Sequence, residues 1–275
     1  MKKALFLAMA ALLWACGGDD DLRVVSAGGS FTCTLSEGGD VNCWGWSDEG
    51  RTSPPDGVYR ELSAGSAHAC ALDDDGRAHC WGLDDDGRTN PPDETFQQIS
   101  AGFFHTCALD DAGRARCWGG NDGGQASPPG VTFRQVSAGL MHSCGVRTDG
   151  ELQCWGSPVD GVLSTPSGSF EMVSVANGFA CALATDGSIQ CWGSDNHGRL
   201  DTPSGAFQEV SAGSNFACAL STGGDVTCWG RDQHGQTQAA AGQFRSVSAG
   251  QTHACAAAAD EVQCWGADDQ GQLRE

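Results

Sequence analysis

Hydrophobic and polar residues alternate along the chain with a period of two, which is the pattern of β-strands and not of helices. His68, Cys70 and Leu72, for example, share one face of a predicted strand. The next three-residue turn, Asp74-Asp75-Gly76, is typical of a hairpin, because its glycine tolerates a positive φ. The pattern predicts short antiparallel strands joined by tight turns.

The same pattern recurs along most of the chain. One series of cysteines repeats every 37 residues, and a second series follows at the same interval until its last member, which comes one residue early. Each second-series cysteine is followed by Trp and Gly, and each first-series cysteine is preceded by Val-Ser-Ala-Gly or a near copy. We therefore expect seven repeats over residues 22–275 and no second domain.

Hairpin geometry brings the two cysteines of each repeat together. A three-residue turn places them directly opposite each other, and in the seventh repeat the two-residue loop Ala259-Asp260 does the same. Opposed residues have Cβ atoms about 4.5–5.5 Å apart, which modest twist brings within disulfide reach. The predicted disulfides are Cys33–Cys43, Cys70–Cys80, Cys107–Cys117, Cys144–Cys154, Cys181–Cys191, Cys218–Cys228 and Cys255–Cys264.

A zinc site is the alternative use of these cysteines. Histidine stands two residues before the first-series cysteine in four repeats, at His68, His105, His142 and His253. Phe31, Phe179 and Phe216 take the same place elsewhere, and phenylalanine cannot ligate a metal. The pattern favours disulfides and no metal, with oxidised cysteines in an exported chain.

A unit of three short strands cannot bury its own faces, so the copies must stack. Seven copies with one hydrophobic rhythm predict an all-β fold, a seven-bladed β-propeller with one short antiparallel sheet per repeat. The tryptophan after each second-series cysteine is expected to pack between blades. A linear solenoid is the alternative, but it needs polar caps, and neither the first nor the last repeat has one.

The first residues have the pattern of an export signal. Lys2 and Lys3 precede an apolar run that ends at Cys16 and is too short to span a bilayer. Leu13-Trp14-Ala15-Cys16 resembles the lipobox of bacterial lipoproteins, which implies an acylated Cys16 as the new N-terminus and a lipid anchor in the membrane. We expect a signal peptide (1–15), a short tether (16–21) and the propeller (22–275), with simple secretion as the alternative.

The charge balance limits the partners. The chain has 35 acidic residues against 15 lysines and arginines, a net charge of −20, and both lysines lie in the predicted signal. A surface this acidic repels nucleic acid and gains no affinity from counterion release. It attracts a basic partner or cations instead.

The repeat resembles the regulator of chromosome condensation repeat family in its bacterial, cysteine-bearing form. Ser100-Ala101-Gly102, the run from His105 to Leu109, Cys117-Trp118-Gly119 and Gly124-Gln125 carry the resemblance. It implies a seven-bladed propeller. The eukaryotic founder exchanges guanine nucleotide on a nuclear GTPase, and a secreted propeller with similarly short repeats inhibits β-lactamases, so the resemblance implies both activities as alternatives.

Catalytic motifs are missing from the sequence. It contains no nucleotide-binding glycine loop, His-Glu-x-x-His motif or nucleophile elbow, so we expect neither an enzyme nor a cofactor. Catalysis or sugar binding on one propeller face is the alternative class, which would require clustered carboxylates in a deep pocket.

One variable turn suggests a binding surface. The turn before the first cysteine holds Phe103 and Phe104 in the third repeat and Leu140 and Met141 in the fourth. Adjacent blades would thus place four large apolar side chains together, and such a patch marks a protein contact if it is exposed. The alternative is that these side chains plug the centre of the ring.

Acidic residues follow Cys-Trp-Gly in every repeat, namely Asp48-Glu49, Asp84-Asp85-Asp86, Asp122, Asp160, Asp195, Asp232 and Asp268-Asp269. They could hold Ca²⁺ or attract a basic ligand. None has the twelve-residue spacing of a calcium loop, which favours a solvated acidic rim. The sequence therefore predicts a monomeric, non-enzymatic propeller at the bacterial cell envelope whose loops face an unidentified, basic protein.

Overall fold

The computed structural model describes residues 22–274. The predicted signal peptide (1–15) and tether (16–21), including Cys16, lie outside the described residues. No helix in the described part of the chain is long and apolar enough to cross a membrane. Its helical segments are two three-residue 3₁₀ turns, η1 (Asp48–Gly50) and η2 (Val159–Gly161).

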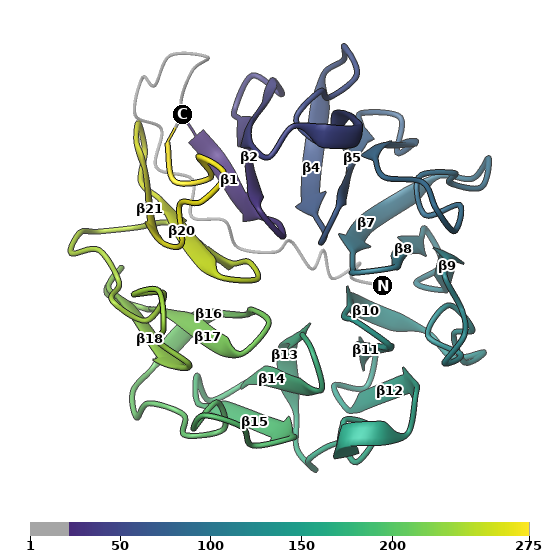
Figure 1. Ribbon diagram of the computed structural model, residues 1–275. Helices are drawn as coiled ribbons and strands as arrows, with labels where there is room; N and C mark the ends of the chain where they lie inside the picture. Colours follow the sequence, from purple (N-terminus) through teal and green to yellow (C-terminus); the bar gives the residue numbers. More distant parts are fainter. Residues whose placement is uncertain (1–21, 275) are drawn as a thin grey trace, which may run out of the picture.

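Seven three-stranded antiparallel sheets form the blades of a ring, and each sheet uses three strands that are consecutive in sequence (Figure 1). Blades 1 to 7 are β1 (Leu22–Ala27), β2 (Phe31–Ser36), β3 (Val41–Gly45); β4 (Tyr59–Ala64), β5 (His68–Asp73), β6 (Ala78–Gly82); β7 (Phe96–Ala101), β8 (His105–Asp110), β9 (Ala115–Gly119); β10 (Phe133–Ala138), β11 (His142–Arg147), β12 (Leu152–Gly156); β13 (Phe170–Val175), β14 (Phe179–Ala184), β15 (Ile189–Gly193); β16 (Phe207–Ala212), β17 (Phe216–Ser221), β18 (Val226–Gly230); β19 (Ser246–Ala249), β20 (His253–Ala257), β21 (Val262–Gly266). The predicted seven-bladed β-propeller is confirmed.

In every blade the middle and outer strands place the two cysteines directly opposite each other, as at Cys70 and Cys80. The structure contains the seven disulfides that the spacing predicts, with Cα atoms 4.0–4.1 Å apart. The shorter turn of the seventh repeat keeps the same register, Cys255 against Cys264. Each disulfide therefore staples one hairpin.

Tryptophans join neighbouring blades. The indole N–H of Trp81 donates to the carbonyl of Arg51 at 3.0 Å, and its ring packs with Phe31 and Leu35 of blade 1. The same bond to the preceding repeat recurs in all seven blades, at 2.7–3.0 Å. The predicted packing of these tryptophans between blades is what the structure shows.

Serines form a second circle of contacts on the inner strands. The hydroxyl oxygen of Ser63, for example, accepts the backbone N–H of Ala101 in the next blade at 2.9 Å. The equivalent serine in every blade makes this bond, and Ser248 makes it to Ala27, from blade 7 back to blade 1. The circle closes without exceptions, so the linear solenoid is excluded.

The ring closes without exchanging strands between its ends. The segment after β21 lies against blade 1, where the carbonyl of Gln272 accepts the hydroxyl of Thr32 at 2.9 Å and the indole N–H of Trp44 at 3.0 Å. Figure 1 shows the end of the described chain beside β1. Residues 267–274 thus act as a clasp for the ring.

Glycine follows each inner strand except β13, which Ala176 follows, because neighbouring blades approach closely there. A Cβ atom on Gly65 would lie 2.3 Å from the carbonyl oxygen of Gly102 and 2.9 Å from the ring of His68. No side chain fits in that space. Close packing between blades therefore favours the Ala-Gly pair, which blade 5 replaces with Val175-Ala176.

Candidate protein-interaction face

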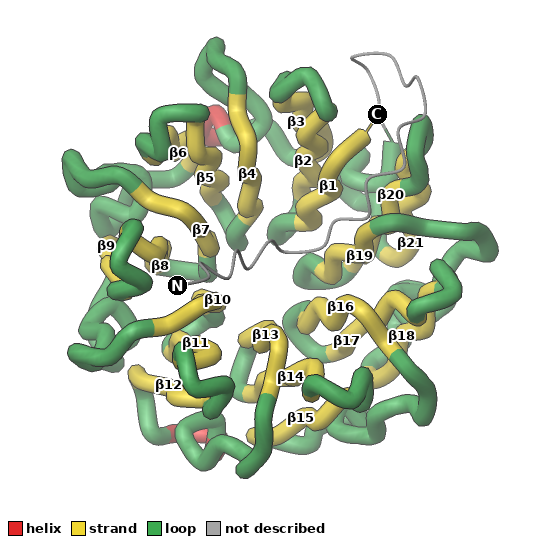
Figure 2. The backbone as a smooth tube through the Cα atoms, turned by 180° about the vertical axis from the view of Figure 1, so that it is seen from behind, coloured by secondary structure: helices red, strands yellow, loops and turns green. Residues whose placement is uncertain are grey.

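The ring has two faces with different turns, which Figures 1 and 2 show from opposite sides. The loop face carries the turns between inner and middle strands and the long loops after the outer strands. These lie side by side, since the N–H of Gly120 donates to the carbonyl of Phe104 at 2.8 Å and Leu83 bonds likewise to Ala67. The hairpin face carries the turns between middle and outer strands.

The four predicted contact residues lie on the loop face, in the turns between β7 and β8 and between β10 and β11. Phe104 is 40% exposed, whereas Phe103, Leu140 and Met141 are half-buried. Phe103 lines a central cavity of about 80 Å³ that the ends of the inner strands enclose. The two phenylalanines thus point in different directions, one toward the centre and one outward, and their role in protein binding stays a prediction.

A buried arginine supports Phe104 from below. Arg88 is only 2% exposed, and its guanidinium donates to the carbonyl of Phe103 and to the carboxylate of Asp86, both at 2.9 Å. The guanidinium carbon lies 5.4 Å from the centre of the Phe104 ring. The exposed ring therefore rests on a fixed cation.

Trp46 is also held against a buried arginine, but ring and arginine here belong to one loop, the one after β3. Its ring lies 4.3 Å from the guanidinium of Arg51, which is 4% exposed and forms an ion pair with Glu49 at 2.6 Å. Trp46 is 39% exposed, and Val159 in η2, after β12, is 61% exposed. Neither residue was predicted from the sequence, although Trp46 and Trp14 are the two tryptophans outside the Cys-Trp-Gly series.

The acidic residues of the loop face fall into two groups, those that bond to their own loop and those that face solvent. In several repeats the first carboxylate closes its own loop, as where Asp232 accepts the N–H of Thr237 at 3.0 Å. That bond lowers the pKa of Asp232. Asp84, Asp195 and Asp268 accept the equivalent amide five residues on. These carboxylates are structural, while others in the same loops face solvent.

The histidines of the repeat are structural as well. His68 Nε2 lies 2.8 Å from the hydroxyl of Thr106, which donates onward to the carbonyl of Arg88, so the ring nitrogen is the donor. His105 meets Ser143 at 2.7 Å and His253 meets Thr32 at 2.9 Å in the same way. Burial lowers the pKa of His68 and His105 to about 3 and that of His253 to about 4, so these rings are neutral.

Phenylalanine at this position accompanies a small neighbour. In the next blade, the place of the hydroxyl-bearing residue is then taken by alanine. Ala69 takes it next to Phe31, and Ala217 takes it next to Phe179. His142 has Ala180 in place of the hydroxyl and bonds to the carbonyl of Val159 at 3.1 Å. Within residues 22–274 no three His, Cys, Asp or Glu side chains are grouped to hold a metal. The position serves blade packing.

Glu209 lies among the inner-strand residues that line the centre of the ring, and its carboxyl group bonds to the next blade as the serines do. Glu209 on β16 accepts the N–H of Val247 in blade 7 at 3.1 Å, and burial raises its pKa to about 7. Gln98 and Gln135 accept the equivalent amide at 2.8 and 2.9 Å. Because glutamine serves equally well there, the position needs an acceptor and not an acid.

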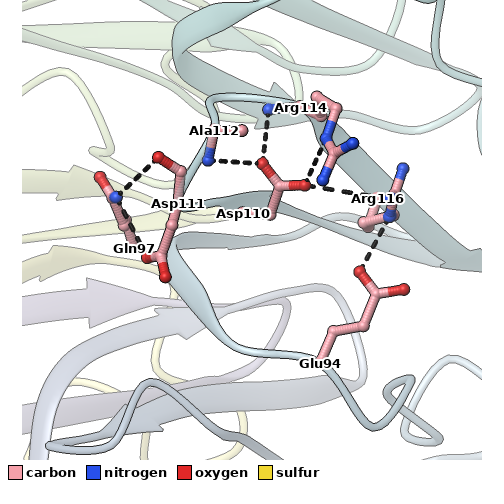
Figure 3. Close-up of polar contacts among 7 residues, drawn as sticks. All are labelled: Glu94, Gln97, Asp110, Asp111, Ala112, Arg114 and Arg116. Atoms are coloured by element: carbon pink, nitrogen blue, oxygen red, sulfur yellow. Dashed lines mark hydrogen bonds and ion pairs between the residues drawn. The ribbon is translucent and has the colours of Figure 1, made fainter.

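On the hairpin face of blade 3, acids and arginines form ion pairs and hydrogen bonds with one another, as Figure 3 shows. Asp110 accepts the backbone N–H groups of Ala112 and Arg114, both at 2.9 Å, and the Arg114 side chain at 2.7 Å. Arg116 pairs with Glu94 at 2.9 Å. Acids and arginines are exposed together on this face, whereas Arg51 and Arg88 of the loop face are buried.

The blades, their interlocking tryptophans and the closed serine circle define a disulfide-stapled seven-bladed β-propeller. The sequence model of the regulator of chromosome condensation (RCC1) repeat matches residues 23–51, 59–88, 96–125, 133–161, 173–199 and 207–236. The chain therefore belongs to this repeat family. The seventh blade lies outside the matched segments and has the same three strands.

Solved structures share the fold. The ectodomain of the receptor kinase CR4 from Physcomitrella patens matches with a TM-score of 0.75 and 26% identity, over 90% of this chain and 74% of that one. The ectodomain of the receptor kinase ACR4 from Arabidopsis thaliana has a TM-score of 0.74 and 20% identity, over 90% and 97%. Prp20p from Saccharomyces cerevisiae, described with its binding to Gsp1p and histones, has a TM-score of 0.71 and 16% identity, over 84% and 80%. No curated protein sequence matches the chain.

Proposed function

We propose that this protein is an exported, non-enzymatic propeller that binds a protein partner on its loop face at the bacterial cell envelope. The observation that carries the proposal is the placement of Trp46, Phe104 and Val159. They are three of the four large hydrophobic residues that the described chain exposes, and all three lie on this face. A rigid ring that presents fixed apolar side chains is suited to binding.

Two further observations support an extracytoplasmic setting. Seven disulfides persist in oxidising compartments and are rare in the cytosol. The similar receptor-kinase structures are ectodomains. The lipobox resemblance at Cys16 adds a lipid anchor, which would hold the ring close to the membrane through the short tether.

Cross-linking capture tests the binding proposal. Purified wild type and the Phe104→Ser/Met141→Ser variant would be incubated with bacterial envelope extract, cross-linked and analysed by mass spectrometry. We expect one partner that the wild type captures and the variant loses. Val58→Ser is the matched control, because Val58 is an exposed apolar residue of the hairpin face. A partner captured equally by all three proteins would contradict binding on the loop face.

Fractionation tests the anchor. We expect the wild type in the membrane fraction, with a fatty-acylated N-terminal peptide by mass spectrometry, and Cys16→Ser in the soluble fraction. An unmodified wild type in the soluble fraction would leave simple secretion as the explanation.

A further inference from the structure

One position in the long loops of the loop face holds aspartate on one side of the ring and uncharged residues on the other. It is the second residue before the glycine of each long loop, and in chain order it holds Asp48, Asp85, Asp122, Val159, Asn196, Gln233 and Asp269. The loops after blades 7, 1, 2 and 3 are neighbours in the closed ring. Four consecutive blades thus carry aspartate here, an acidic arc formed by Asp269, Asp48, Asp85 and Asp122, and the other three do not.

The carboxylates of the acidic arc are available for binding. All four aspartates are exposed, and none has a side-chain hydrogen bond or ion pair with another described residue. They differ in this from Asp84 and Asp232, which close their own loops. No contact within the described ring therefore requires a carboxylate at these four positions.

The exposed aromatic side chains lie in the same part of the face. Trp46 and Phe104 cover Arg51 and Arg88, and each of these arginines is paired with one acid, Glu49 or Asp86. Arg51 and Arg88 are thus buried and paired, and Arg274 in the loop after blade 7 is exposed but paired with Asp268 at 3.2 Å. What remains unpaired at this surface is the two aromatic rings and the four carboxylates of the arc.

We infer that the acidic arc and the rings of Trp46 and Phe104 bind an extended basic segment of a partner protein, one that carries arginines or lysines among apolar residues. Aspartates on successive blades would pair with successive cations of such a segment. The outer faces of the two rings would accept guanidinium or apolar groups. This inference rests on the proposed function and adds the chemistry of the partner to it.

Titration of a model peptide tests the inference. The probe is a peptide of alternating arginine and leucine, compared with its glutamate-leucine counterpart, by calorimetry on the full chain. We expect the basic peptide alone to bind. The variant D48N/D85N/D122N/D269N should weaken binding at least about tenfold, and most of the affinity should be lost at about 0.3 M salt.

Two controls separate a site from overall charge. E37Q/D40N/D74N/D75N removes the same number of exposed acids from the hairpin turns of blades 1 and 2 and should change affinity less than about twofold. Trp46→Ala/Phe104→Ala should weaken binding at least about fivefold, and Val58→Ala should not. Thermal melts of all variants would show that the ring is intact.

The opposite results would overturn the inference. Equal weakening by both sets of acid substitutions would mean attraction by net charge alone. Calcium binding that only the arc variant loses would mean a metal site instead. If the arc variant still captured the envelope partner, the inference would fail and the proposed function would stand. If neither the wild type nor any variant captured a partner while the wild type bound the basic peptide, the proposed function would fail and the peptide site would stand.

Discussion

Two sectors of the loop face stand on the same ring and differ in chemistry. In the loops after blades 7, 1, 2 and 3, the outward position is Asp269, Asp48, Asp85 or Asp122, and aromatic rings lie nearby. In the loops after blades 5 and 6 the position is Asn196 or Gln233. Strands, disulfides and serine bonds are the same beneath both sectors. The difference therefore has no explanation in the strands, disulfides or serine bonds, and the proposed binding of a basic segment rests on it.

The largest effect is expected where the acidic sector crosses the seam between blades 7 and 1. Deleting residues 268–275 removes the carbonyl of Gln272 from Thr32 and Trp44, and the free energy of unfolding should fall by about 5 kcal/mol, since each buried donor without an acceptor costs about 1–3 kcal/mol and the packing of the clasp is also lost. Chemical denaturation measures the change. Deletion of residues 274–275 is the control and should cost little; equal losses would contradict the role of Gln272.

Acid should weaken the three interfaces that contain neutral histidines. His68, His105 and His253 have folded pKa values of about 3 to 4 against an ordinary 6.5, so the unfolded chain binds more protons below pH 6.5 and stability falls as the pH falls. Glu209, whose pKa is raised to about 7, acts in the opposite direction. In a Glu209→Gln background we expect a loss of about 4 kcal/mol between about pH 7.5 and 5.5, measured by denaturation.

A smaller loss is expected from one broken histidine pair. Thr106→Ala removes the partner of His68 Nε2 and should cost about 1–3 kcal/mol, because a buried donor is left unsatisfied. The double variant His68→Phe/Thr106→Ala copies the Phe31 and Ala69 pair and should recover most of that loss. If the double variant were less stable than the single one, the two kinds of interface would not be interchangeable.

The smallest change in stability is expected from the exposed patch itself. Phe104→Ser/Met141→Ser should lower the free energy of unfolding by less than about 1 kcal/mol, because Phe104 is largely exposed and Met141 is half-buried. Partner capture should nevertheless be lost. Unchanged capture together with a large loss of stability would mean that these side chains only pack the ring.

The architecture could be predicted from the sequence because the same spacing of cysteines, glycines and tryptophans recurs in all seven repeats. The 37-residue interval and the compensating turn at Ala259-Asp260 determine the register of the cysteines, and the register determines the disulfides. The closure through Gln272 was not predictable, because it depends on contacts between residues 228 apart in sequence. Nor was the pairing of His68 with Thr106, since the two lie in different repeats.

The surface was less predictable than the fold. Sequence reasoning selected Phe103, Phe104, Leu140 and Met141 by size alone, and only the structure separates the outward ring of Phe104 from that of Phe103, which faces the central cavity. Acids that close loops and acids that face solvent look alike in sequence, since both follow Cys-Trp-Gly. Backbone bonds such as that of Asp232 distinguish them.

The clasp at Gln272 also has a consequence for the order of events during synthesis and export. Blade 1 emerges first, yet its Thr32 and Trp44 wait for an acceptor made at the other end of the ring. Until residue 272 has been made, these two buried donors have no acceptor and one flank of blade 1 is uncovered. The ring therefore gains its full stability only when the last residues of the seventh repeat have been added.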